Sequence, residues 1–331
     1  MEDWSTARAF WAETAERYFV DDETLAATQE ALDMGLMPLS SLSVPDGRKM
    51  LEKLYSHKHR VAFDGKIEDQ QVPSSVTKGY NIPVTVYKPS SSSAVSTIVL
   101  YFHGGGLIYG DNKKMYENSL KTIAKGSAAV IIYVEYRLLP ECADTDPMAP
   151  FNDAVDVTNW ALQNKTSLGG QAKTKVGVLG DSAGGLISLY VSDIIKDVRF
   201  QALVYSWINF DQTEDQSCQE FASVPAFNTK AMQHIIKIVN PLLSFPGNNP
   251  RLNPAIRENV ASSPPTLVVV GQLDPLRDSN VDYAGKLKKS GVDTRLVLME
   301  GLPHGFFSAA NFVKANVTAC THIVRFIKSI N

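Results

Sequence analysis

Hydrophobic residues gather in short runs with little polar alternation from about residue 72 to the end of the chain. Runs of this kind, rich in β-branched residues, are typical of strands that are covered on both faces of a sheet. The pattern predicts strands at 97–102, 129–134, 175–180, 200–205 and 266–271. An earlier pair of segments, near 70–77 and 82–88, is more typical of an antiparallel hairpin at the edge of the sheet.

Helical patterns occupy the intervals between these strands, near 115–125, 150–163, 184–196, 279–290 and 311–328. Strands and helices that alternate in this way indicate an α/β fold with a mostly parallel central sheet flanked by helices. No internal repeat, low-complexity tract or heptad run interrupts this order.

Two segments, 1–60 and 211–263, do not follow the alternation of strand and helix. The first carries Trp4, Trp11 and Tyr18 at helical spacing, and the second is polar, then helical, then rich in Pro and Asn. We expect the two segments to meet as a helical cap over the sheet. The expected division is 1–60 for the N-terminal part of the cap and 61–331 for the main domain, within which 211–263 contributes to the cap.

Length and charge narrow the classes of protein that fit this pattern. The chain has 331 residues, of which 44% are hydrophobic and 20% are charged, so it can bury a sizeable core in one large domain or two small ones. Its formal net charge of −3 gives no electrostatic reason to bind nucleic acid or an anionic membrane. The oligomeric state stays open between a monomer and a homodimer.

Cysteine usage and the first residues indicate a compartment. Cys142, Cys218 and Cys320 are far apart, odd in number and without a CxxC pair, which argues against a disulfide framework and a zinc site. The start of the chain, MEDWSTARAF, lacks the order of a signal peptide, and no apolar stretch approaches the ~20 residues that span a bilayer. We expect a cytoplasmic protein without stable membrane insertion, and we expect neither a metal nor a cofactor.

The residues Gly180–Gly184, GDSAG, mark a corner between a predicted strand and a predicted helix. The G-x-S-x-G pattern lifts a serine hydroxyl clear of a sheet, and small residues on either side let the turn close. The start of the helix also presents free N–H groups to developing negative charge. A glycine-rich helix start with an incidental serine is the alternative. The pattern makes Ser182 the candidate nucleophile.

A serine nucleophile needs a base, and His304 is the candidate among the six histidines. It follows the strand-like segment TRLVLME in a short loop. This loop lies at the carboxyl end of a strand, where α/β sheets carry their active-site residues. The other positions are less suitable, because His57 and His59 lie in a basic stretch, His234 in the expected cap and His322 inside the last helix.

The base needs a carboxylate to orient it, and Asp274 lies just after the predicted strand 266–271. The chain order Ser182, Asp274, His304 is the order that α/β-hydrolases use. Asp278 is the rival carboxylate, but its place at the start of a helix suits an N-terminal cap better.

A run of glycines, Gly104–Gly106, follows His103 just past the strand 97–102. Consecutive glycines let backbone N–H groups approach a substrate oxygen with no side chain in the way. A flexible turn or a phosphate loop is the alternative, whereas a dinucleotide fingerprint is unsupported because the G-x-G-x-x-G order is missing. His103 itself is interpreted as a structural residue that holds the loop.

Five segments, in order along the chain, resemble one known family. They are HGGG (103–106), VEYRLLPE (134–141), GDSAGG (180–185), PPTLVVVGQLDPLRD (264–278) and LPHGF (302–306). From about residue 72 to its end the chain is similar to the hormone-sensitive-lipase-like branch of the α/β-hydrolases, which includes bacterial carboxylesterases and animal arylacetamide-deacetylase-like esterases. The resemblance implies the α/β-hydrolase fold with a helical cap.

The same resemblance implies roles for individual residues. It implies a triad of Ser182, Asp274 and His304, oxyanion donors from the N–H groups of Gly105, Gly106 and Ala183, and a loop shaped by Gly104. Leu107 departs from the family, which often has a large aromatic residue after HGGG, so we expect the acyl side of the substrate pocket to differ in shape. Asp181 is the second expected pocket residue.

The expected function is a serine carboxylesterase that cleaves small apolar esters of short to medium acyl chain, roughly two to eight carbons, through an acyl-enzyme. An amidase or deacetylase that uses the same site is the alternative, because these residues do not separate an ester from an activated amide. A lyase or a non-catalytic small-molecule receptor of the same fold fits less well, since related receptors have lost the histidine and His304 is present here.

Overall fold

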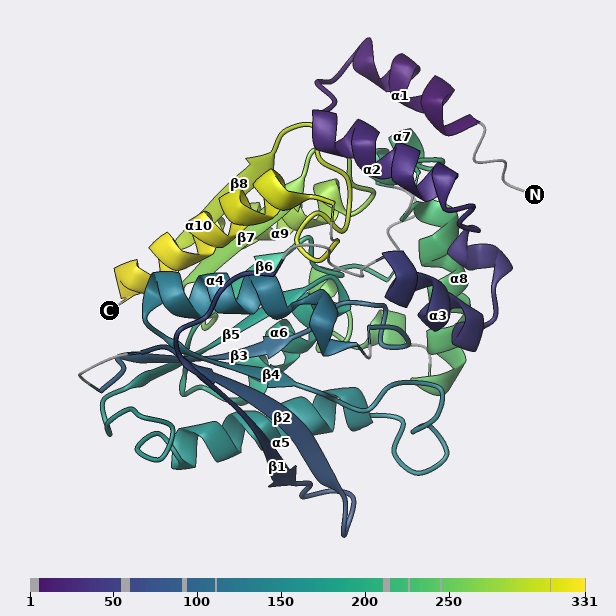
Figure 1. Cartoon of the computed structure of the whole chain (residues 1–331). Helices are drawn as coiled ribbons and strands as arrows, with labels where there is room; N and C mark the ends of the chain where they lie inside the picture. Colours follow the sequence, from purple (N-terminus) through teal and green to yellow (C-terminus); the bar gives the residue numbers. More distant parts are fainter. Residues whose placement is uncertain are drawn as a thin grey trace.

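An eight-stranded sheet runs through the described part of the protein (Figure 1). The computed structural model describes residues 6–54, 60–90, 94–110, 112–210, 215–225, 227–244, 246–309 and 311–330. Trp4, His57 and His59, which were considered above, lie outside the described residues.

The strand order is that of a mostly parallel sheet with an antiparallel edge. The strands are β1 (Lys66–Pro73), β2 (Asn81–Lys88), β3 (Thr97–Phe102), β4 (Val130–Val134), β5 (Lys175–Asp181), β6 (Val198–Val204), β7 (Thr266–Gly271) and β8 (Thr294–Met299). They lie in the order β1-β2-β4-β3-β5-β6-β7-β8. β2 is antiparallel to both β1 and β4, and the other neighbouring pairs are parallel. The predicted α/β sheet and its edge hairpin are confirmed.

The central strands are covered on both faces, which explains their unbroken hydrophobic runs. All residues of β3, β4 and β7 are buried. In β3, Ile98 and Leu100 belong to one core cluster and Val99 and Tyr101 to another, because successive side chains of a strand point to opposite faces. A strand of this kind has no solvent face, so its sequence does not alternate.

Helices cover both faces of the sheet (Figure 1). α4 (Glu117–Ser127) and α10 (Val313–Ile330) pack on one face, and α5 (Ala149–Gln163), α6 (Ala183–Ile194) and α9 (Arg277–Lys289) pack on the other. The sequence predicts each of these helices, and the bounds differ only at the ends. Short 3₁₀ helices at Lys113–Met115 (η3), Pro246–Asn248 (η5) and Pro254–Ile256 (η6) lie in the connections.

The helices of the two segments outside the alternation lie together (Figure 1). They are α1 (Ala7–Ala15), α2 (Asp22–Asp33), η2 (Leu39–Ser41) and α3 (Val44–Leu54) from the first segment, and α7 (Gln216–Glu220) and α8 (Thr229–Leu242) from the second. Tyr18 joins the two segments, because its hydroxyl donates to Glu220 Oε2 at 3.0 Å. The expected contact between the segments is therefore present, while the division of the chain into a cap and a main domain stays a prediction.

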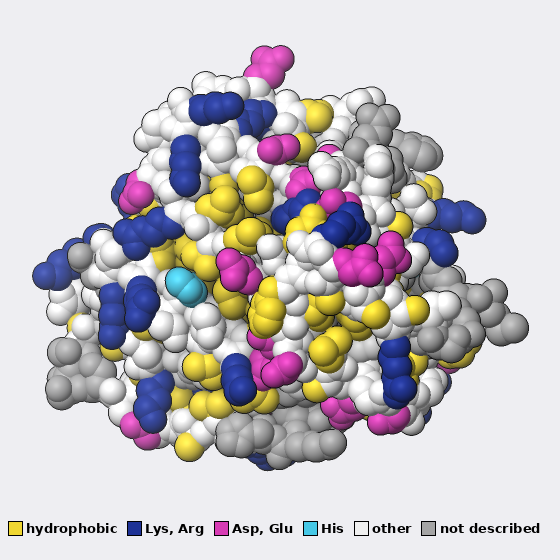
Figure 2. All heavy atoms as spheres, turned by 90° about the horizontal axis from the view of Figure 1, so that it is seen from above, with side chains coloured by type: hydrophobic (Ala, Val, Ile, Leu, Met, Phe, Trp, Pro, Cys, Tyr) yellow, Lys and Arg dark blue, Asp and Glu magenta, His cyan; other side chains and the backbone are white. Residues whose placement is uncertain are grey.

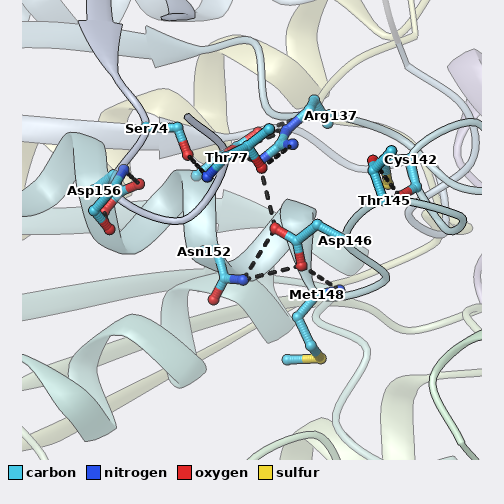
Figure 3. Close-up of polar contacts among 11 residues, drawn as sticks. Ser74, Thr77, Arg137, Cys142, Thr145, Asp146, Met148, Asn152 and Asp156 are labelled. Atoms are coloured by element: carbon cyan, nitrogen blue, oxygen red, sulfur yellow. Dashed lines mark hydrogen bonds and ion pairs between the residues drawn. The ribbon is translucent and has the colours of Figure 1, made fainter. Parts of the chain in front are cut away.

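An arginine fastens the long connection between β4 and α5 (Figure 3). Arg137 forms ion pairs with Asp153 at 2.6 Å and Asp146 at 3.4 Å, and its guanidinium donates to Thr77 Oγ1 at 2.8 Å. The same guanidinium lies 4.4 Å from the ring centroid of Tyr80. These contacts tie the connection after β4 both to the start of α5 and to the tip of the β1–β2 hairpin. They therefore restrain the path of this connection.

The surface on the side of α1 and α2 mixes charges of both signs. Seen from the top of Figure 1, Lys and Arg side chains are interspersed with Asp and Glu around groups of hydrophobic side chains (Figure 2). Within the described ranges, no helix combines the length and the apolar character that crossing a membrane requires. The cytoplasmic location stays a prediction.

Candidate active site

Ser182 stands at the corner between β5 and α6 in strained backbone. Its φ of 54° and ψ of −119° lie outside the regions that residues with a Cβ favour. Ser182 N donates to Val204 O at 2.9 Å, which holds the corner against the end of β6. Gly184 lets α6 start close to β3, because a Cβ at this position would collide with Phe102 O. The structure therefore has the sharp corner that GDSAG predicts.

The structure brings Ser182, His304 and Asp274 together from three distant parts of the chain. His304 Nε2 lies 3.1 Å from Ser182 Oγ, and His304 Nδ1 lies 2.9 Å from Asp274 Oδ2. All three side chains are buried. Asp274 follows β7 and His304 follows β8, so parallel strands deliver both residues to the carboxyl edge of the sheet where the corner of Ser182 lies.

Asp278 has a different role from the one that its position suggests. Leu276 occupies the N-cap position of α9 and Asp278 lies in the first turn, so the expectation that Asp278 caps this helix is wrong. Its carboxylate accepts from Ser217 N at 2.7 Å, which satisfies an N–H group at the start of α7. The N–H of Leu276 is instead bound by Asp274 Oδ1 at 2.8 Å. The orienting carboxylate therefore also stabilises the turn that leads into α9.

Two aromatic rings enclose the imidazole of His304. The ring centroid of Tyr205 lies 4.4 Å and that of Phe227 lies 4.3 Å from the imidazole centroid. Phe227 belongs to the segment 211–263, which the sequence predicts as part of the cap, whereas the sequence analysis did not single out Tyr205. The available signal for Tyr205 was its place at the carboxyl end of a predicted strand, beside the other candidate residues.

The glycine loop presents two N–H groups to the same space. Gly105 and Gly106 have φ of 111° and 62°, in the left-handed region that glycine adopts without strain. Both residues line the cavity beside Ser182, and no acceptor for their N–H groups is found among the described residues. Ala183 is the first residue of α6, so its N–H has no partner within the helix. These three groups can bind a substrate oxygen.

Gly104 serves the loop in another way. Its N–H donates to Asp181 Oδ1 at 2.9 Å and is therefore engaged. A Cβ on Gly104 would lie 2.7 Å from Asp181 Oδ2 and 3.1 Å from the Ser182 Cβ, so only glycine fits between them. Gly104 thus shapes the loop, as expected, and does not supply an oxyanion donor.

Asp181 is a buried carboxylate beside the cavity. The hydroxyl of Tyr101 donates to its Oδ1 at 2.5 Å, and the hydroxyl of Tyr205 lies 3.4 Å from Oδ2. Burial raises the pKa of Asp181 to about 6, although the hydrogen bonds from Tyr101 and Gly104 N and the nearby His304 act against the rise. Asp181 lines the cavity, as expected for a pocket residue, and it connects the serine corner to the glycine loop.

His103 is a structural residue of the glycine loop. Its ring is fully enclosed and stacks on Tyr136, with the centroids 4.2 Å apart, and its Nδ1 lies 2.7 Å from Gly104 O. Burial lowers the pKa of His103 to about 4, so the imidazole is neutral near pH 7. The contacts support the interpretation that His103 holds the loop.

A cavity of about 150 Å³ opens beside Ser182 and His304. Its apolar walls come from both cap segments: Ala27, Ala31, Leu36, Leu39, Met50 and Leu51 from the first, and Phe227, Met232 and Ile235 from the second. An apolar cavity with few polar groups at one point of its wall is the usual form of a small-molecule site.

Leu107, which was expected in the substrate pocket, lies elsewhere. Leu107 is fully buried in the core and does not line the cavity, because the loop turns at this residue with a φ of 67°. Trp11 and Tyr18 pack beside Phe221 within the cap rather than on the cavity.

Among the described residues, the other histidines and the cysteines do not line this cavity. His234 is on α8 and His322 on α10, and neither lines the cavity. Cys142, Cys218 and Cys320 are buried free thiols. The described part of the chain contains no group of three or more His, Cys, Asp or Glu residues that could hold a metal ion.

Comparisons with known proteins point to one family. A family model described as alpha/beta hydrolase fold matches residues 99–308. The chain is 30% identical over 245 residues to esterase LipI of Mycobacterium tuberculosis. This alignment covers 72% of this chain and 75% of the relative. The chain is 24% identical over 306 residues to ethyl acetate hydrolase of Pseudomonas putida. This alignment covers 88% of this chain and 93% of the relative.

A solved structure extends the likeness to the whole fold. An esterase of Pyrobaculum calidifontis matches with a TM-score of 0.78 and 25% sequence identity, over 94% of this chain and 99% of that chain. The family model spans well over half of the chain, and these relatives are named as ester hydrolases. The chain therefore belongs to the α/β-hydrolase family of enzymes, in the hormone-sensitive-lipase-like branch that its motifs resemble.

Proposed function

We propose that this protein is a serine carboxylesterase that hydrolyses esters of short to medium acyl chain through an acyl-enzyme at Ser182. The observation that carries the proposal is the continuous line of contacts from Ser182 Oγ through His304 to Asp274, at 3.1 and 2.9 Å. A serine with a base within hydrogen-bond reach, and a carboxylate that orients this base, is the arrangement that activates a hydroxyl for attack on a carbonyl.

In the first half of the proposed reaction, His304 Nε2 accepts the proton of Ser182 as Oγ attacks the ester carbonyl. Asp274 keeps the imidazole oriented and stabilises its positive charge. The carbonyl oxygen becomes an oxyanion, to which the N–H groups of Gly105, Gly106 and Ala183 donate. The tetrahedral intermediate collapses when the C–O bond to the alcohol breaks and His304 returns the proton to the leaving oxygen.

In the second half, the acyl group is transferred to water. His304 accepts a proton from a water molecule, and the resulting hydroxide attacks the acyl carbon bound to Ser182 Oγ. The same N–H groups stabilise the second oxyanion. When the bond between Oγ and the acyl carbon breaks, His304 returns the proton to Ser182 and the carboxylic acid is released.

The proposed preference for short to medium acyl chains is supported by the size and the lining of the cavity. A volume of about 150 Å³ with apolar walls favours a small apolar group over a long chain. Each buried CH₂ adds up to ~0.8 kcal/mol of binding while space remains, after which further carbons must protrude or distort the cap. The substrate class that fits is a small apolar ester.

The proposal is tested by labelling the protein with a fluorophosphonate, which reacts with activated serines. We expect stoichiometric labelling of the wild-type protein, complete loss of labelling in Ser182→Ala, and unchanged labelling in Ser167→Ala, which removes an exposed hydroxyl that does not line the cavity. Ester hydrolysis should follow the same pattern, with a loss of about 10⁴-fold or more in Ser182→Ala. Labelling without any ester turnover would contradict the esterase proposal and favour a binding protein.

A further inference from the structure

The glycine loop is held by anchors from different parts of the chain. Two come from the main α/β fold: Tyr136 donates its hydroxyl to His103 O at 2.7 Å, and Leu139 N donates to Leu107 O at 2.9 Å. A further anchor comes from the N-terminal segment, where Arg48 of α3 donates from Nε to Ile108 O at 2.9 Å. The N-terminal segment therefore reaches the backbone of the loop itself.

Arg48 is well placed to hold this position. Its Nη1 and Nη2 donate to Glu141 Oε1 and Oε2 at 2.8 and 3.0 Å, and Nη2 also lies 3.3 Å from Leu139 O. The planar guanidinium thus joins one carboxylate and two backbone carbonyls in a single fork, a geometry that lysine does not reproduce. The pairing with Arg48 lowers the pKa of Glu141, so the carboxylate is ionised at neutral pH.

The partners of Arg48 belong to a rigid platform. Leu139 and Glu141 lie on the connection after β4, which Arg137 fastens to Asp153 and Asp146 (Figure 3). Because this connection is fixed to the start of α5, the carboxylate of Glu141 presents a stable target for the guanidinium of Arg48. The ion pair therefore places α3 relative to the main fold.

The inner side of α3 is also a wall of the cavity. Met50 and Leu51 line the cavity, and Gly47 packs so closely on Tyr109 that an added Cβ would lie 2.8 Å from the ring. Tyr109 belongs to the glycine loop and lines the same cavity. α3 thus contacts the loop through both Gly47 and Arg48.

We propose that Arg48 is a positioning residue, which couples the docking of α3 over the cavity to the geometry of the oxyanion donors. The turn from Gly105 to Tyr109 is closed by Ile108 N and Tyr109 N, which donate to Gly105 O at 3.1 and 2.8 Å. Arg48 holds Ile108 O in that turn, so the bond restrains the peptides of Gly105 and Gly106. Glycine has the widest choice of backbone conformations, and external anchors are needed to aim its N–H groups at a developing charge.

The inference rests on the proposed esterase mechanism, because it assigns Arg48 an effect on the oxyanion. Without its anchor, the loop samples orientations in which one N–H misses the oxygen. We expect Arg48→Met to lower kcat by about 10-fold to 10²-fold, less than the ~10²–10³ typical of removing a donor outright. KM should change by much less than kcat, because the lost interaction acts in the transition state.

Graded variants separate the contacts of Arg48. Arg48→Lys should lose less activity than Arg48→Met, because an ammonium group can still reach one acceptor. Glu141→Gln should have the smallest effect, since Glu141 is 58% exposed and the bond to Ile108 O remains. Lys49→Met is the matched control on the same helix, because the Lys49 side chain is 77% exposed and its Nζ lies 4.0 Å from Asp46 Oδ1.

The decisive measurement is the affinity for a short-chain alkyl trifluoromethyl ketone, which forms a tetrahedral adduct with an activated serine and bears an oxyanion. We expect its inhibition constant to rise in Arg48→Met by about the same factor as kcat/KM falls, while fluorophosphonate labelling still reaches one group per chain. An unchanged inhibition constant, or an equal loss of activity in Lys49→Met, would overturn the role of Arg48. Absence of ester turnover in the wild-type protein would instead contradict the proposed function.

Discussion

Asp274 Oδ2 lies 2.9 Å from His304 Nδ1, whereas the carboxylate of the nearby Asp278 binds Ser217 N at the start of α7. Asp274 lies in the turn before α9 and Asp278 in the first turn of α9, and the two carboxylates therefore have different partners. Asp274 contacts the imidazole that in turn contacts Ser182, and Asp278 binds the start of a neighbouring helix.

This separation predicts that Asp274→Asn is far more damaging than Asp278→Asn. An asparagine beside His304 favours the wrong imidazole tautomer and cannot stabilise its positive charge, which reduces kcat by up to about 10⁴-fold in enzymes of this type. We expect the kcat of Asp274→Asn on p-nitrophenyl acetate to be at least about 10²-fold below that of Asp278→Asn. Equal losses in the two variants would show that Asp274 is not the orienting carboxylate.

Alanine substitutions in the glycine loop should rank by what the new Cβ meets. At Gly105, where φ is 111°, it would collide with the backbone of Tyr109, whereas at Gly106, where φ is 62°, it would lie 2.6 Å from a side-chain atom, Ile235 Cγ2. We expect Gly105→Ala to lower kcat by about 10²-fold to 10³-fold, as for a misplaced oxyanion donor, and Gly106→Ala to lower it less. Steady-state kinetics and fluorophosphonate labelling of both variants check this ranking, and the reverse order would contradict it.

The buried carboxylate of Asp181 predicts a pH-dependent contribution to stability. Burial raises its pKa from an ordinary value of 3.8 to about 6, so between these pH values the folded protein retains a proton that the unfolded chain releases. The free energy of unfolding therefore falls as the pH rises through this window, by about 3 kcal/mol in total. Below about pH 3 the carboxyl group is neutral in both states, and this cost is absent.

Asp181→Asn removes this titration and keeps an oxygen that can accept from Gly104 N. We expect the stability of the variant relative to the wild-type protein to improve by about 3 kcal/mol between pH 3 and pH 7. Urea unfolding at several pH values measures the difference, and comparison of the two proteins cancels the titration of all other groups. A difference that does not change with pH would contradict the prediction.

The cavity predicts a maximum in activity along a series of p-nitrophenyl esters. We expect kcat/KM to rise from the acetate and to peak at or below about eight acyl carbons, since each buried CH₂ adds binding until the apolar space is full. It should then fall toward the palmitate. Emulsified lipid should cause no jump in rate. A maximum at the palmitate would indicate a long-chain lipase with an open cap.

The features of this protein that depend on short stretches of chain could be predicted from the sequence. The apolar runs mark strands covered on both faces, and β3 and β7 have the bounds that these runs predict. GDSAG likewise determines its own corner, because Gly184 allows the close approach to β3 that the turn requires. The placement of Asp274 and His304 after strands was sufficient to select them, because parallel strands deliver their carboxyl ends to one edge.

Contacts between residues from distant segments could not be predicted from the sequence and are known only from the packed structure. That Asp278 binds α7, that Tyr205 and Phe227 enclose His304, and that Leu107 turns into the core depend on contacts between elements far apart in sequence. Arg48 is the clearest case, because its position in an exposed-looking helix gives no sign that it reaches Ile108 O in the glycine loop. Hydrophobic periodicity indicates which residues are buried, but not which residues they contact. The contacts depend on the distance and orientation between packed helices and strands, which periodicity does not contain.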